Sequence, residues 1–311
     1  MPTLFRYCLQ LVALIISSLL LADTADSELP PMTWEVLEFE RKSTWGDARS
    51  RLSLSRIPAA ELSAVLQQPG SRSYLQPNPE ERVQELKVEA TVGTKNQVSL
   101  QLLMHPETQA LYQRSRFSIG RKDRRFKFFR YAEDGLTRLR KDPADKKEAK
   151  LPQQQWSRSS STEVNYSEEL QHTAVTSPFA LFVILSRLTS EQLAQQPVLL
   201  VNTDTNVYKV TLSPQPTVQL DVKYNLTRTG QAAQRRKETV DATPVKLLVA
   251  PTALASNKPD FELMGLSGEI TVFVDSLDHT PLRVAGIAPR VGAAHLDIAN
   301  AVLVERQEPS D

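Results

Sequence analysis

Apolar and polar residues alternate along most of this chain. The clearest run holds Val218, Leu220, Val222 and Tyr224, which are separated by polar residues. Because successive side chains of a strand point to opposite faces, this run predicts a strand with one apolar and one polar face. That pattern is typical of an antiparallel sheet that packs on one face only.

Similar runs at 98–102, 208–212 and 270–275 predict further strands of the same kind. Turn residues such as Asp134-Gly135 separate many of the runs. No long alternation of strands with helices is present in the sequence, which argues against a doubly wound nucleotide-binding fold. The remaining strands are expected near 33–40, 48–56, 84–92, 109–118, 124–131, 136–141, 157–165, 197–202, 239–249, 281–287 and 293–304.

Two helices are predicted to interrupt the strands in the second half of the chain. Ser177 and Pro178 are typical of a helix start, and residues 179–185 follow with no polar face. A helix that is apolar on all sides must be buried, and the concavity of a curved sheet would bury it. Residues 189–192 match a capping box and predict a short second helix. An earlier helix is expected over 59–67.

These elements predict a mainly β protein, built as a curved antiparallel sheet (an open or half barrel) with a buried apolar helix and one or two short helices. Surface excursions are expected near 68–82, 142–155 and 227–237. The mixed charge run at 142–150 is also compatible with a domain boundary. The strands before and after it share one pattern, which favours a single β-rich domain over residues 23–311.

The first 22 residues have the pattern of a secretory signal peptide. Arg6 precedes an apolar stretch at 11–22, and polar residues follow at once. We expect cleavage after Ala22, with Ala25 as the alternative site and an uncleaved anchor as the alternative role. Cys8 would leave with the signal, so the mature chain would hold no cysteine and, after cleavage, no transmembrane segment. An exported protein of this size without disulfides suits a Gram-negative periplasm.

Composition excludes several kinds of chemistry. The 311 residues are 41% hydrophobic and 23% charged, with 37 basic against 36 acidic residues, as in a globular protein. The single cysteine excludes a disulfide framework and a multi-cysteine zinc site. The four histidines are not at metal-ligand spacing, and Ser267 lacks the second glycine of a hydrolase elbow. We therefore expect no catalytic residue, cofactor or metal.

The charge balance hides a basic segment at 114–141. It holds eleven basic residues against three acidic ones, and aromatic residues lie between them. If Asp134-Gly135 forms a two-residue turn, Tyr131 opposes Arg138 and Phe129 opposes Arg140 on one face. Arginine beside an aromatic ring suits a phosphate, a carboxylate or a polyanionic envelope polymer. The alternative is a solvated hairpin whose arginine stems cover apolar surface.

The carboxy-terminal third carries a series of short structural motifs. Gly265-Leu-Ser-Gly268 leads into a strand, and Thr280-Pro-Leu-Arg283, Gly286 and Gly292 follow. With Arg130-Tyr131 and Gly135, these residues resemble a family of uncharacterised Gram-negative periplasmic proteins, known only as a domain of unknown function. The resemblance covers about 110–305. It implies a curved antiparallel sheet around a helix, similar in outline to the periplasmic lipoprotein carriers, and implies no catalytic residue.

These observations favour an exported, non-enzymatic protein that binds a lipid-like or anionic envelope ligand or assists envelope assembly. We expect an anionic lipid, a glycan or an envelope protein as the partner, and no nucleic acid. A periplasmic hydrolase with a dispersed active site is the alternative. The candidate binding residues are Lys127, Phe129, Tyr131, Arg138 and Arg140, and the candidate cavity-lining residues are Phe179, Phe182 and Leu185.

Overall fold

The computed structural model describes residues 32–304, apart from 42–46, 63–64, 94–95, 121–122, 205 and 255–259. The expected signal peptide at 1–22 lies outside the described residues. Contacts divide the chain into Met1–Pro30 and Pro31–Asp311, and all described residues belong to the second unit.

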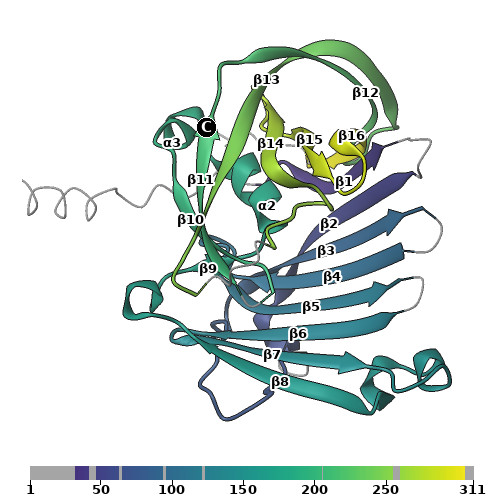
Figure 1. Ribbon diagram of the computed structural model, residues 1–311. Coiled ribbons are helices and arrows are strands. Elements are labelled where there is room, and N and C mark those ends of the chain that lie inside the picture. Colours follow the sequence, from purple (N-terminus) through teal and green to yellow (C-terminus); the bar gives the residue numbers. More distant parts are fainter. Residues whose placement is uncertain are drawn as a thin grey trace, which may run out of the picture. The chain divides into compact units, whose positions relative to one another are not determined.

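The described residues form one sheet of sixteen strands, and only the two-residue β9 falls outside the predicted runs. Many of the strands alternate buried and exposed positions as expected, and the prediction of a mainly β fold with a curved antiparallel sheet is confirmed (Figure 1). The strands are β1 (Trp34–Arg41), β2 (Ala48–Pro58), β3 (Arg82–Val92), β4 (Asn96–Met104), β5 (Leu111–Ile119), β6 (Arg124–Ala132), β7 (Gly135–Asp142), β8 (Arg158–Asn165), β9 (Val175–Thr176), β10 (Val198–Asn202), β11 (Val207–Pro214), β12 (Val218–Arg228), β13 (Gln234–Pro251), β14 (Ser267–Asp275), β15 (Pro281–Ala288) and β16 (Gly292–Leu303).

The strand order has two parts that share β16. Strands β1 to β8 pair with their sequence neighbours as an antiparallel meander, which β1 joins to β16. Strands β12 to β16 close a five-stranded ring, because β12 pairs with β13 on one side and, in parallel, with β16 on the other. The second half of the long β13 also pairs with β11. This pairing joins β11, β10 and β9 to the rest of the sheet.

The predicted apolar helix is confirmed as α2 (Ala180–Arg187), and all eight of its residues are buried. The ring of Phe182 lies 5.5 Å from that of Phe39 on β1. The indole nitrogen of Trp34 donates a 2.8 Å hydrogen bond to the Ser186 hydroxyl. The next residue, Arg187, pairs with Glu107 in the turn between β4 and β5, 2.9 Å apart. Helix α2 therefore ties β1 to this turn through apolar and polar contacts.

The capping box at 189–192 is also confirmed and opens α3 (Ser190–Ala194). The backbone amide of Gln192 donates to the Thr189 hydroxyl at 3.2 Å, and the Thr189 amide donates to the Gln192 side chain at 2.9 Å. Both groups would otherwise lack partners in the first helical turn.

Two local predictions are wrong. The helix expected over 59–67 is only a 3₁₀ turn at Ala59–Leu62, whose Leu62 packs in a small apolar cluster with Val83 and Leu103. The loop expected at 227–237 belongs mostly to strands, because β12 and β13 form a hairpin with a tight turn. In that turn Gly230 adopts a φ of 79°, a conformation that a glycine adopts without strain.

We predict that Phe182→Ala lowers the free energy of unfolding by about 3–5 kcal/mol, since it leaves a cavity between α2 and β1. Urea denaturation followed by circular dichroism measures the change. Leu248→Ala is the control, because this leucine on β13 is half exposed and should tolerate truncation. Equal effects of the two substitutions would contradict the role of α2 in the core.

Candidate functional site

The hairpin of β6 and β7 carries all five candidate binding residues, and its register differs from the prediction. Glu133 and Asp134 form the turn, and Ala132 pairs with Gly135. Phe129 therefore opposes Arg138 rather than Arg140. The predicted pairing is wrong by two residues. A two-residue shift leaves every side chain on its predicted face.

Gly135, at the start of β7, is closely packed against β8. It lies within β7, where an added Cβ would stand 2.2 Å from the carbonyl oxygen of Val164 on β8 and 2.7 Å from the Arg72 side chain. The glycine is therefore required by close packing of β8 and the segment around Arg72, not by the turn that precedes it.

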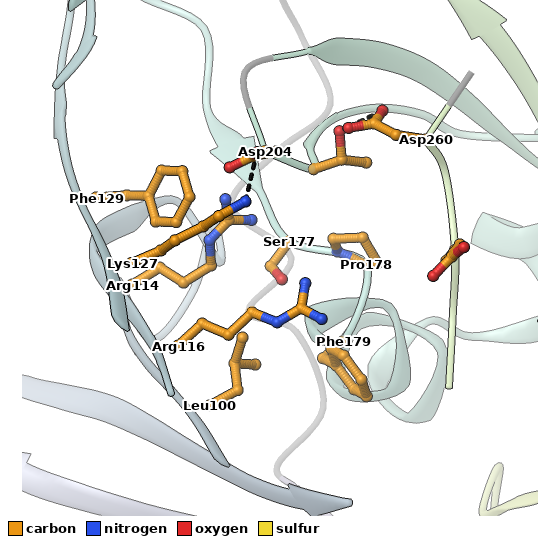
Figure 2. A pocket seen from close by; sticks show the side chains of 12 residues that line it. Leu100, Arg114, Arg116, Lys127, Phe129, Ser177, Pro178, Phe179, Asp204 and Asp260 are labelled. Atoms are coloured by element: carbon orange, nitrogen blue, oxygen red, sulfur yellow. Dashed lines mark hydrogen bonds and ion pairs between the residues drawn. The ribbon is translucent and has the colours of Figure 1, made fainter. Parts of the chain in front are cut away.

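A cavity of about 270 Å³ lies where one face of β4, β5 and β6 meets the beginning of α2. The turn between β10 and β11 and the residues just before β14 complete its wall (Figure 2). We call this cavity the α2 pocket. It is lined by Leu100, Arg114, Arg116, Lys127, Phe129, Ser177, Pro178, Phe179, Thr203, Asp204, Asp260 and Glu262.

Arg114 on β5 is held rigidly in the wall of the α2 pocket, with only 4% of its surface exposed. Its guanidinium lies 3.8 Å from the ring centroid of Phe129, and Nη1 donates a 2.8 Å hydrogen bond to the carbonyl oxygen of Asn202. The Tyr131 hydroxyl donates to the Asn202 side chain at 2.9 Å and so fixes that acceptor. Nη2 of Arg114 is buried and has no hydrogen-bond partner among the described residues. A buried charged donor without an acceptor is costly, so this nitrogen is suited to bind an anion.

Lys127 on β6 and Arg138 on β7 share the carboxylate of Asp204. The Lys127 ammonium lies 2.6 Å and Nη1 of Arg138 3.1 Å from the same oxygen. Burial alone would raise the pKa of Asp204, but Lys127, Arg138 and the nearby Arg114 outweigh it and hold the pKa below its usual value. Burial lowers the pKa of Lys127, and the ion pair with Asp204 only partly opposes this effect. One carboxylate thus serves two cations, which leaves the group with a net positive charge.

Arg116, two residues beyond Arg114 on β5, extends toward the start of α2 (Figure 2). Its side chain is exposed and makes no hydrogen bond or ion pair with another described residue. Desolvation by the surrounding protein, and then the charge of Arg114, lower its pKa. Facing it, the Ser177 hydroxyl is buried and also lacks a partner in the described part of the chain. Arg116 and Ser177 therefore present two further unused polar groups at the beginning of α2.

The opposite wall of the α2 pocket is acidic. Asp260 accepts hydrogen bonds of 2.8 Å from Thr203, Asn206 and Tyr208, all to one carboxylate oxygen. These three donors fix Asp260 beside the turn between β10 and β11. Glu262 follows it and is exposed. An anion in the pocket is therefore attracted to the β5–β6 wall and repelled by this one.

The structure separates the candidate residues of the sequence analysis. Lys127, Phe129 and Phe179 line the α2 pocket. Tyr131 lies buried behind Asn202, and Arg138 pairs with Asp204. The remaining three lie elsewhere: Arg140 pairs with Asp142, and Phe182 and Leu185 pack in the core rather than along the pocket.

Sequence reasoning missed several lining residues. Asp204 lies in the turn between β10 and β11, and its contacts with Lys127 and Arg138 join residues far apart in the chain. The sequence around Asp260 does not mark it as a site residue either, because its hydrogen bonds also join residues far apart in the chain. Arg114 and Arg116 did carry a signal, since they lie two residues apart in the basic segment and so share one face of a strand.

One basic residue of that segment has a structural role instead. Arg130 is fully buried and donates hydrogen bonds to the carbonyl oxygens of Gln67, Leu75 and Tyr112. Burial lowers its pKa to about 10. Arg130 thereby fixes the segment around Gln67 and Leu75 against the sheet.

Searches of protein-family models, curated proteins and solved structures found no match to this chain. The resemblance to the periplasmic family therefore stays a prediction. Within the described residues, no helix is long and apolar enough to span a membrane, and no group of three or more His, Cys, Asp or Glu side chains could hold a metal ion. Fold and site together define a mainly β protein with a charged, partly apolar pocket beside a buried helix.

We predict that Asp204→Asn lowers the free energy of unfolding at neutral pH by about 1–2 kcal/mol, because Lys127 and Arg138 lose their shared carboxylate. The pKa of Asp204 is lowered by folding, so its contribution is present above about pH 4 and is lost as the pH falls through the folded pKa. Urea denaturation of both proteins over a range of pH measures the difference. Asp221→Asn, at an exposed position on β12, is the control. A difference that grows toward acid pH would contradict this account.

Proposed function

We propose that this chain is an exported, non-enzymatic protein of the bacterial envelope that binds an anionic group, a phosphate or a carboxylate, in the α2 pocket. The observation that carries the proposal is the buried Nη2 of Arg114, which has no partner among the described residues. Arg116 and the Ser177 hydroxyl add unused donors at the same cavity. Hydrogen bonds between cationic donors and an anion are among the strongest in proteins, particularly where water is partly excluded.

The anionic group is expected to belong to a larger molecule with an apolar part next to it. Leu100, Phe129 and Phe179 line the same pocket as the cations. Ligand sites typically combine such apolar walls with a few fixed polar groups. The volume of about 270 Å³ suits a head group, and α2 itself fills the space beside the sheet where an acyl chain would lie. The pocket therefore favours the polar end of an envelope ligand over its lipid tail.

Export is supported by the sequence alone. The basic start, the apolar stretch at 11–22 and the polar residues that follow have the order of a signal peptide. A chain with no cysteine after Ala22 suits the periplasm. Fractionation of the native host, with immunodetection of the chain, tests this part of the proposal independently of binding.

Arg116→Gln is expected to weaken binding of inorganic phosphate and glycerol phosphate at least about 10-fold, because one charge-assisted contact is lost. Isothermal titration calorimetry measures the affinities. Arg228→Gln, at an exposed position on β12, is the matched control and should bind as the native protein does. Unchanged affinity in Arg116→Gln, or no binding by the native protein, would overturn the proposal. Steady release of phosphate from glycerol phosphate would instead favour the hydrolase alternative.

A further inference from the structure

The α2 pocket lies at one end of a longer basic surface. Residues that pair directly across neighbouring strands lie on the same face of a sheet. Arg116 pairs with Lys127, Lys127 with Arg140, and Arg140 with Ser160. The same face continues through Asp142, which pairs with Arg158 on β8. We call this surface the basic face; its cations are Arg114, Arg116, Arg125, Lys127, Arg138, Arg140 and Arg158.

The basic face carries more cations than its carboxylates can neutralise. Asp142 is shared by Arg125 and Arg140, just as Asp204 is shared by Lys127 and Arg138. Each carboxylate therefore leaves one of its two cations uncompensated. The side chain of Arg158 is exposed and makes no hydrogen bond or ion pair with another described residue.

A second cavity lies at the far end of this face. Its volume is about 300 Å³, and it is adjacent to the α2 pocket because its Arg140 is the cross-strand neighbour of Lys127. Directly paired side chains lie about 5 Å apart at Cβ. We call this cavity the rim pocket; it is lined by Asp123, Arg124, Arg125, Arg140, Asp142, Pro143 and Arg158.

The dimensions of the basic face exceed those of a single anionic group. Four residues along a strand cover about 14 Å, and the three spacings from β5 to β8 cover about 14 Å as well. Cations that are two residues apart on one strand stand about 7 Å apart. Such a surface can contact several anionic groups of one ligand at the same time.

From this arrangement we propose that the ligand is a linear polyanion, which places one anionic group in the α2 pocket and further groups along the basic face to the rim pocket. This inference rests on the proposed function, since the α2 pocket anchors the chain. Asp260 and Glu262 close the other side of the pocket with negative charge. The polyanion is therefore directed toward β8.

A polymer fits this surface better than a membrane does. Six of the seven cations line one or the other of two cavities, three in each, so the positive charge is divided between two hollows although the side chains of Arg116 and Arg158 are exposed. A membrane surface would need cations that protrude together. An extended chain with repeated phosphates or carboxylates can enter both cavities.

Binding of orthophosphate, tripolyphosphate and long-chain polyphosphate tests the inference, with polygalacturonate as the carboxylate probe. The full chain after signal removal is titrated by calorimetry. Long-chain polyphosphate is expected to bind about 100-fold more tightly than orthophosphate, because linked groups bind with a high effective concentration. In the double variant Arg140→Gln with Arg158→Gln, the ratio of the affinities for long-chain polyphosphate and orthophosphate should fall about 10-fold, since two charged contacts are lost.

The control is Arg56→Gln with Arg228→Gln, two exposed arginines on β2 and β12 outside the basic face. This double variant should still bind long-chain polyphosphate about 100-fold more tightly than orthophosphate. Circular dichroism checks that all variants fold. If orthophosphate fails to bind, the proposed function itself is overturned. If orthophosphate binds but chain length brings no gain, or the gain survives Arg140→Gln with Arg158→Gln, only the polyanion inference is overturned. Tighter binding to phosphatidylglycerol vesicles than to any polymer, lost in the same variant, would overturn it in favour of a membrane surface.

Discussion

The burial of α2 is the interaction on which the rest of the structure depends. An eight-residue helix has little stability of its own, so it persists because apolar packing holds it from all sides. The contacts of Phe182 with Phe39 and of Ser186 with Trp34 fix the helix to β1. Because α2 is fixed, Ser177 and Phe179 at its beginning are also fixed, and they form part of the α2 pocket. The pocket is therefore a consequence of how the core is closed.

Two buried arginines show how the same chemistry serves structure in one place and a site in another. Arg130 and Arg114 both donate to carbonyl oxygens, and both have a buried Nη2 without a partner among the described residues. Arg130 contacts the segment around Gln67 and Leu75 and so belongs to the packing of the fold. Arg114 has an equally buried Nη2, but its side chain lines the α2 pocket. What distinguishes the two arginines is the cavity beside Arg114, and this cavity depends on which segments surround each side chain.

The near-neutral net charge of the chain results from an unequal distribution. Cations gather on one face of β5 to β8, while Asp142 and Asp204 each serve two of them. Shared carboxylates keep the arginines oriented and still leave positive charge available to a ligand.

Much of the fold was readable from the sequence. Alternation predicted nearly every strand, and the apolar run at 179–185 predicted a buried helix, because both patterns depend on local periodicity. The basic segment and the shared face of Lys127 and Phe129 were readable for the same reason. The closure of the five-stranded ring and the contacts of Asp204 and Asp260 were not. They join residues far apart in the chain, such as Lys127 and Asp204, and only the tertiary structure brings these together.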